Sequence, residues 1–142
     1  MGARMTLVRL DNWPRLLSEA VEIARLTPFR WGIHDCALFA VDLVRAITGT
    51  DLGTAVRGRY QDAQGAAEVM IEVFGTARLD EVVTQLLGEP IAVTLAQRGD
   101  VVLLDVIEGP ALGVCLGMVA VGAGPTGTVM VPMEKWVKAW RV

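Results

Sequence analysis

The chain has 142 residues and a formal net charge of −3, and 53% of its residues are hydrophobic. This length predicts a single domain with one core, and the composition excludes a disordered chain. The charges are scattered without a basic stripe, which argues against nucleic acid as a partner. The two cysteines lie far apart, which indicates reduced thiols.

The first half of the chain is predicted to be helical. Residues 1–13 have no long apolar core before their first charges, so no secretory signal is expected. Pro14 is tolerated in the first turn of a helix, and glycines at 49, 75 and 88 are typical helix stops. The four helices are expected from near Asn12 or Trp13 to the Thr27–Pro28 stop, from about 36 to 48, from 61 to 74 and from 79 to 87.

The second of these helices is predicted to be buried. Apolar residues cover almost its whole circumference, and only Asp42 and Arg45 interrupt them. Asp35 stands where a side chain can cap the exposed N–H groups of the first turn. The apolar stretch is too short to cross a bilayer, so we expect no membrane span.

From Pro90 onward the pattern changes to short runs rich in β-branched residues, separated by Gly, Pro and Thr. Residues 107–110 and 124–127 are predicted hairpin turns. The runs are residues 91–95, 100–107, 111–117, 118–123, 127–132 and 138–142. Helices followed by antiparallel strands predict an α+β fold. We expect one domain over residues 1–142, with a helical half at about 12–88. The strand-rich half, at about 90–142, should form a sheet of about five or six strands against the buried helix.

Cys36 is the clearest candidate for a chemically reactive residue. A thiol at a helix N-terminus, behind an aspartate, can have a lowered pKa and can face an oxyanion site. The alternative is that Cys36 is a small apolar residue in the first turn of a core helix. Local features alone leave both readings open.

Three stretches resemble, in order, the layout of NlpC-type cell-wall cysteine peptidases, which are bacterial relatives of papain. They are "FRWGIHDCALFAVDLV" from Phe29, "RGDVVLL" from Arg98 and "ALGVCLG" from Ala111. The resemblance covers roughly residues 28–117. It implies an NlpC-like (papain-like) fold with Cys36 in the position of the nucleophile.

A second resemblance extends over nearly the full length. The motifs "WGIHDCALFA", "RGRY" (57–60), "RGDVV" (98–102), "ALGVCLG" and "AWRV" (139–142) resemble a family of small proteins encoded among the tail-tip genes of long-tailed phages and gene transfer agents. This resemblance implies a virion component of the tail tip or baseplate, made in the host cytoplasm. The partners it implies are a hub, a distal tail protein or the end of a tape-measure protein.

The sequence departs from the peptidase pattern at the base. The alignment of "ALGVCLG" places Ala111 where the peptidase histidine belongs, and no histidine follows His34. The third polar position falls in "MVAVGAGP" (118–125), which has no polar candidate. A thiol nucleophile needs a base, and a leaving amine needs an acid. The departure argues against ordinary peptidase chemistry.

His34 leaves two interpretations open. It could form a rearranged dyad with Cys36, with Asp35 or Asp100 orienting the imidazole. Residues two apart usually point away from each other, so we favour a role in which the ring hydrogen-bonds a backbone carbonyl or loop and holds the entry to the helix. The cysteines, His34 and Asp35 lack the spacing of zinc ligands, and no cofactor is expected.

Three functions are therefore weighed: a structural or interaction protein of the tail tip, a cysteine peptidase or amidase that cleaves peptidoglycan stem peptides during entry, and a tail assembly factor absent from the virion. Arg98 to Asp100 spell "RGD", for which we expect a turn before a strand. Candidate partner contacts are Trp31, Arg57, Arg59, Tyr60, Trp136 and Trp140.

Overall fold

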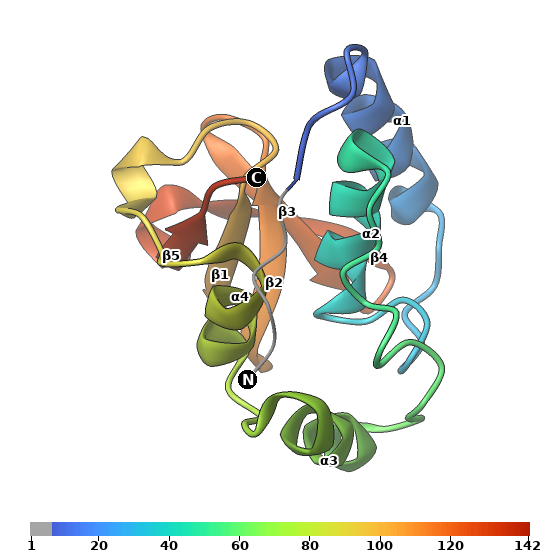
Figure 1. Ribbon diagram of the computed structural model, residues 1–142. Coiled ribbons are helices and arrows are strands. Elements are labelled where there is room, and N and C mark those ends of the chain that lie inside the picture. Colours follow the sequence, from blue (N-terminus) through green and yellow to red (C-terminus); the bar gives the residue numbers. More distant parts are fainter. Residues whose placement is uncertain (1–6) are drawn as a thin grey trace.

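The computed structural model describes residues 7–142 and has an α+β architecture (Figure 1). In this range there are four α-helices, two short 3₁₀ helices and one antiparallel sheet with strand order β4-β3-β2-β1-β5. The helices are α1 (Trp13–Arg25), α2 (Leu38–Thr48), α3 (Ala63–Phe74) and α4 (Leu79–Leu87), with η1 (Val93–Leu95) and η2 (Met133–Lys135). The strands are β1 (Val101–Val106), β2 (Gly109–Cys115), β3 (Val119–Gly124), β4 (Gly127–Pro132) and β5 (Trp136–Trp140). None of the helices in residues 7–142 has both the length and the apolar character of a membrane span.

The helix boundaries follow the expected start and stop residues closely. Helix α4 has the predicted bounds, and α1 begins at Trp13 with a proline in its first turn. Helix α3 starts two residues later than expected because the Asp62 side chain accepts a hydrogen bond from the Gly65 N–H and fixes the first turn. Gly49 and Gly75 take the left-handed conformation at the ends of α2 and α3.

Five of the six predicted strands are present, and the prediction for residues 91–95 is wrong. Ile91 forms a single bridge to Ala139, and the chain then turns into η1. Residues three apart share one side of a 3₁₀ helix, so Val93 and Ala96 both pack on the apolar cluster of β5. The turn into η1 therefore places two apolar side chains on this cluster.

Helix α2 lies between α1 and the sheet, as the buried pattern predicted (Figure 1). Phe39, Leu43 and Ile47 are almost fully buried and share one cluster with residues of β1, β2 and β3. Leu17 of α1 closes this cluster from the side away from the sheet. The main core is thus built around α2.

The sheet must curl, because β4 and β5 are its two edges and only three residues connect them. A flat sheet of five strands is about 19 Å across, whereas the backbone from Pro132 to Trp136 can span at most about 15 Å. The Trp136 indole N–H donates to the Val131 carbonyl over 2.9 Å, which ties the end of β4 to the start of β5. Both residues belong to a second apolar cluster, distinct from the cluster around α2.

We predict that Trp136→Phe lowers the free energy of unfolding by about 1–3 kcal/mol, because it removes the buried hydrogen bond from β5 to the Val131 carbonyl of β4. Urea unfolding followed by circular dichroism measures the change. Val137→Ala, at an exposed position of the same strand, is the control and should change stability by less than about 0.5 kcal/mol. Equal stability of Trp136→Phe and the wild type would show that this hydrogen bond does not hold the two edges together.

Candidate functional site

The site begins with a tight turn just before α2. The backbone N–H and C=O groups of Arg30 and His34 pair with each other, with both N···O distances at 2.8 Å. Gly32, inside this turn, has φ +81°, and a Cβ at this position would overlap the backbone oxygen of Tyr60. Only glycine fits both the conformation and the space.

The Asp35 carboxylate joins this turn to the start of α2. The side chain is fully buried and accepts four hydrogen bonds, from the N–H groups of Gly32, Ala37 and Leu38 and from the Tyr60 hydroxyl at 2.6 Å. The predicted cap is therefore confirmed, although α2 itself begins at Leu38. All four lone-pair positions of the carboxylate are in use, so Asp35 is a structural residue.

The Cys36 thiol lies half-buried beside this carboxylate. Burial, and then the charge of Asp35, raise the pKa of the thiol to about 11, and its own backbone N–H opposes the rise only partly. The expectation that the helix N-terminus lowers the thiol pKa is therefore wrong for this environment. Near neutral pH Cys36 is a protonated thiol, which is a poor nucleophile.

His34 does not act on Cys36 in this arrangement. Its ring is buried edge-on against Phe39, with ring centroids 5.7 Å apart. Within residues 7–142 no hydrogen bond joins His34 to Cys36, and the His34 Nε2 atom has no partner there. Burial lowers the pKa of the imidazole, and Asp42 and Asp35 oppose this effect. Among the described residues no hydrogen bond from the ring to a backbone carbonyl or loop is found, and His34 closes the turn before α2 through its backbone.

Asp100, the other candidate for orienting His34, serves the opposite end of the domain. It is 1% exposed and accepts from the Arg9 guanidinium and from the N–H groups of Gln97 and Val142. The RGD sequence therefore forms a closed turn before β1, as predicted, and its aspartate is not available to a partner.

Strand β2 passes directly beside Cys36. The Leu112 N–H donates to the Cys36 carbonyl over 2.8 Å, so the start of β2 borders the thiol. The β2 residue that lines the cleft in front of Cys36 is Pro110, and Ala111 next to it is buried. Neither side chain can take or give a proton.

A cleft of about 500 Å³ opens in front of Cys36. Its walls come from the turn before α2, from α3, from the start of α4 and from the sheet. Three of its ionisable residues, Arg78, Asp80 and Lys138, form a cluster at its far end. The other lining residues are Trp31, Asp35, Cys36, Ala37, Tyr60, Ala63, Ala66, Ala67, Met70, Ala77, Leu79, Leu103, Pro110 and Val137.

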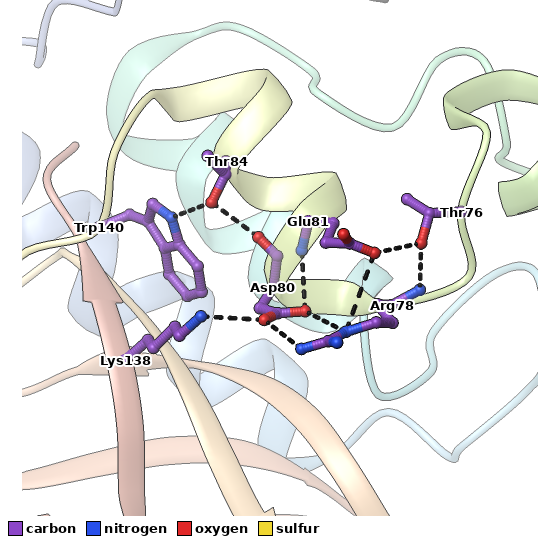
Figure 2. Close-up of polar contacts among 7 residues, drawn as sticks. All are labelled: Thr76, Arg78, Asp80, Glu81, Thr84, Lys138 and Trp140. Carbon is purple, nitrogen blue, oxygen red and sulfur yellow. Dashed lines mark hydrogen bonds and ion pairs between the residues drawn. The ribbon is translucent and has the colours of Figure 1, made fainter.

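Figure 2 shows how this cluster joins α4 to β5. The Asp80 carboxylate accepts from Arg78 twice, from the Lys138 ammonium at 2.9 Å and from the Glu81 N–H. Hydrogen bonds from Arg78 and then Lys138 lower the pKa of Asp80 to about 2. One turn further along α4, Thr84 accepts from the Trp140 indole N–H.

The predicted partner contacts divide into three groups. Trp31 and Tyr60 line the cleft. Arg57 bridges Asp42 and Asp51, and exposed Arg59 pairs with Glu72 of α3, so both brace the domain's own elements. Trp136 and Trp140 are corrections to the prediction, because both side chains are buried and have partners inside the domain.

The sequence reading missed Arg78, Asp80 and Lys138. Asp80 and Lys138 are 58 positions apart, and no motif connects them. The sequence signal for this cluster is weak. It consists of two acidic residues in the first turn of a predicted helix, where acidic side chains interact favourably with the helix dipole. In residues 7–142 no three His, Cys, Asp or Glu side chains form a group that could hold a metal ion.

We predict that Cys36 reacts with iodoacetamide at least about a hundredfold more slowly than free cysteine near neutral pH, because its thiolate fraction is so small. The rate should rise as the pH approaches about 11. Mass spectrometry after digestion separates Cys36 from buried Cys115. Rapid alkylation of Cys36 near neutral pH would contradict the environment described here.

We predict that Asp80→Asn lowers the melting temperature most at neutral pH. Because the pKa of Asp80 is depressed in the folded state, its stabilisation is present above the ordinary carboxyl pKa of 3.8 and is lost as pH falls toward about 2. The difference between wild type and variant should shrink over this interval in thermal melts. Glu81→Gln, at a half-exposed neighbour, is the control and should have a smaller effect. A difference independent of pH would show that the cation contacts do not act through the carboxylate charge.

Comparison with known proteins gives a family and no curated relative. The family described as "Domain of unknown function (DUF6950)" matches residues 8–142. No curated protein matches the chain. Since the match covers nearly the whole chain, the protein belongs to this family.

Proposed function

We propose that the protein is a structural and interaction component of a phage or phage-like tail tip or baseplate. In this proposal it has an NlpC-like, papain-like fold that no longer carries out peptidase chemistry. The observation that carries the loss of catalysis is the environment of Cys36: a thiol with its pKa raised to about 11, bordered by Pro110 and Ala111 where a base would be needed.

The arrangement around Cys36 supports an origin from an NlpC-like enzyme. Cys36 lies at the entry to a buried helix, and β2 borders it through the Leu112–Cys36 hydrogen bond. The cleft opens in front of the thiol, between the helices and the sheet. The resemblance to NlpC-type peptidases implies this arrangement, in which a cysteine at the entry to a helix faces a cleft and lies beside a strand.

The remaining ionisable groups of the cleft do not replace the missing base. Asp35 and Asp80 each accept four hydrogen bonds, and the pKa of Asp80 is lowered to about 2. Burial and the hydrogen bond to Asp35 raise the pKa of Tyr60. A general base must be ready to accept a proton near the working pH, and the lowered pKa of Asp80 and the raised pKa of Tyr60 do not suit that role.

The tail context is supported by the motifs shared with tail-tip gene products. Several motif residues brace the domain: Tyr60 of "RGRY" binds Asp35, Arg57 binds Asp42 and Asp51, and Trp140 of "AWRV" is a core residue. Motif residues that stabilise the fold are consistent with a protein that has lost peptidase activity and binds its partners through its shape. Its partners would be a hub, a distal tail protein or the tape-measure end.

We predict that the protein co-purifies with assembled tails at a fixed stoichiometry and that Cys36→Ser particles remain infectious. Serine keeps the size of the side chain and removes the thiol, so a scaffold should tolerate it. Quantitative mass spectrometry of purified particles and a plaque or transfer assay measure the two outcomes. Arg15→Ala, at an exposed position of α1, is the control variant.

Two results would contradict the proposal in different ways. Absence of the protein from purified particles would favour an assembly factor. Loss of infectivity in Cys36→Ser, together with cleavage of peptidoglycan stem peptides by the wild type, would establish the cysteine peptidase or amidase.

A further inference from the structure

The cleft in front of Cys36 has an apolar side and a polar end. Small residues of α3 (Ala63, Ala66 and Ala67) line one wall and leave room for a peptide backbone to approach. Leu103 and Val137 of the sheet supply further apolar surface. The rim is open to solvent, since Val137 and Arg78 are both exposed.

The carboxylates of the cleft have no hydrogen-bonding capacity left for a ligand. A carboxylate offers about four lone-pair positions. Asp35 uses them for three backbone N–H groups and the Tyr60 hydroxyl. Asp80 uses them for Arg78, Lys138 and the Glu81 N–H. A cationic ligand would therefore find no acceptor in either residue.

The donors at the polar end do have capacity left. The Lys138 ammonium makes one hydrogen bond, although it has three hydrogens, and 41% of its side chain is exposed. The Arg78 Nη1 atom makes none within the described residues, and 72% of that side chain is exposed. Over residues 7–142 the Leu79 N–H, at the positive end of the α4 dipole, likewise has no acceptor.

The formal charges of this cluster cancel, since Arg78 and Lys138 face Asp80 and Glu81, so the asymmetry lies in which groups still have hydrogen-bonding capacity. Two cations surround one carboxylate, of which only 11% of the side chain is exposed. Glu81 is the other acidic group in contact; it lies 3.8 Å from the Arg78 Nε and accepts from the Thr76 hydroxyl, so within residues 7–142 it leaves the Arg78 Nη1 and the remaining Lys138 hydrogens free. Exposed cationic N–H donors beside an apolar wall complement a ligand with an apolar group next to a carboxylate.

We propose that this cleft binds an acidic peptide segment of a partner protein, with a carboxylate on Arg78 and Lys138 and an apolar side chain against α3 and the sheet. This inference rests on the proposed function, since it supplies the partner contact of a domain that does not cut. The segment would lie across the mouth of the cleft, in front of the Cys36 thiol.

The test uses two end-capped peptides, Ala-Leu-Ala-Glu-Glu and its uncharged match Ala-Leu-Ala-Gln-Gln, titrated into the ¹⁵N-labelled full chain. Saturating shifts of the Cys36, Arg78 and Lys138 amides are expected with the acidic peptide. The affinity for the glutamine peptide should be lower by about tenfold or more, because charge-assisted hydrogen bonds are lost.

Variants separate a charge effect from a folding defect. The double variant Arg78→Gln and Lys138→Gln should weaken binding of the acidic peptide about tenfold or more. Lys138→Arg keeps the charge and should retain binding, and Arg15→Ala, far from the cleft, should bind like the wild type. Thermal melts report whether each variant is folded.

The outcomes are distinct from those for the proposed function. Equal shifts with both peptides, unchanged binding by the folded double variant, or no saturating shift would overturn the inference and leave a non-catalytic domain intact. Mass spectrometry of the same samples detects cleavage of either peptide. Cleavage of a peptide by the wild type but not by Cys36→Ser would overturn the proposed function. The preference for the glutamate peptide over the glutamine peptide would still be measured from the amide chemical shifts.

Discussion

The buried Asp35 carboxylate is the interaction on which the rest of the site depends. Its four hydrogen bonds connect the turn at Gly32, the first turn leading into α2 and Tyr60, which comes from a segment 25 positions away. Hydrogen bonds to a buried charge contribute about 1.5–3 kcal/mol each when one partner is removed. Because α2 is the centre of the main core, the position of this carboxylate fixes where the helix meets the sheet.

The same carboxylate opposes catalysis by its neighbour. A thiol at the entry to a helix can be acidic when cations or a metal surround it, but a buried negative charge beside it disfavours the thiolate. At Cys36 burial and Asp35 act in the same direction, and β2 supplies no imidazole to offset them. A catalytic cysteine would require this site to stabilise two adjacent negative charges. The Asp35 carboxylate thus stabilises the entry to α2 and disfavours the Cys36 thiolate.

Local chemistry made much of the fold predictable, whereas contacts between distant segments were not. The proline at the start of α1, the glycines after α2 and α3 and the turn at 124–127 act within a few residues, so their effects could be read from the sequence. The failure at residues 91–95 has the opposite cause: packing of Val93 against the cluster around β5 overrode the strand pattern. The burial of Trp136 and the Asp80–Lys138 pair likewise depend on how the sheet curls, which no local pattern encodes.

The two saturated carboxylates that line the cleft, Asp35 and Asp80, differ in the groups that bind them. Asp35 is bound by backbone and hydroxyl dipoles and by no cation among the described residues, so its negative charge acts on the adjacent thiol. Asp80 is bound by two cations, so the groups beside it with capacity left for a ligand are N–H donors. The Asp80 contacts also hold α4 against β5 (Figure 2). Asp35 holds together the turn before α2, the start of that helix and Tyr60. The residues that set the width of the cleft are therefore the same ones that polarise it, and a change in either carboxylate should alter shape and charge together.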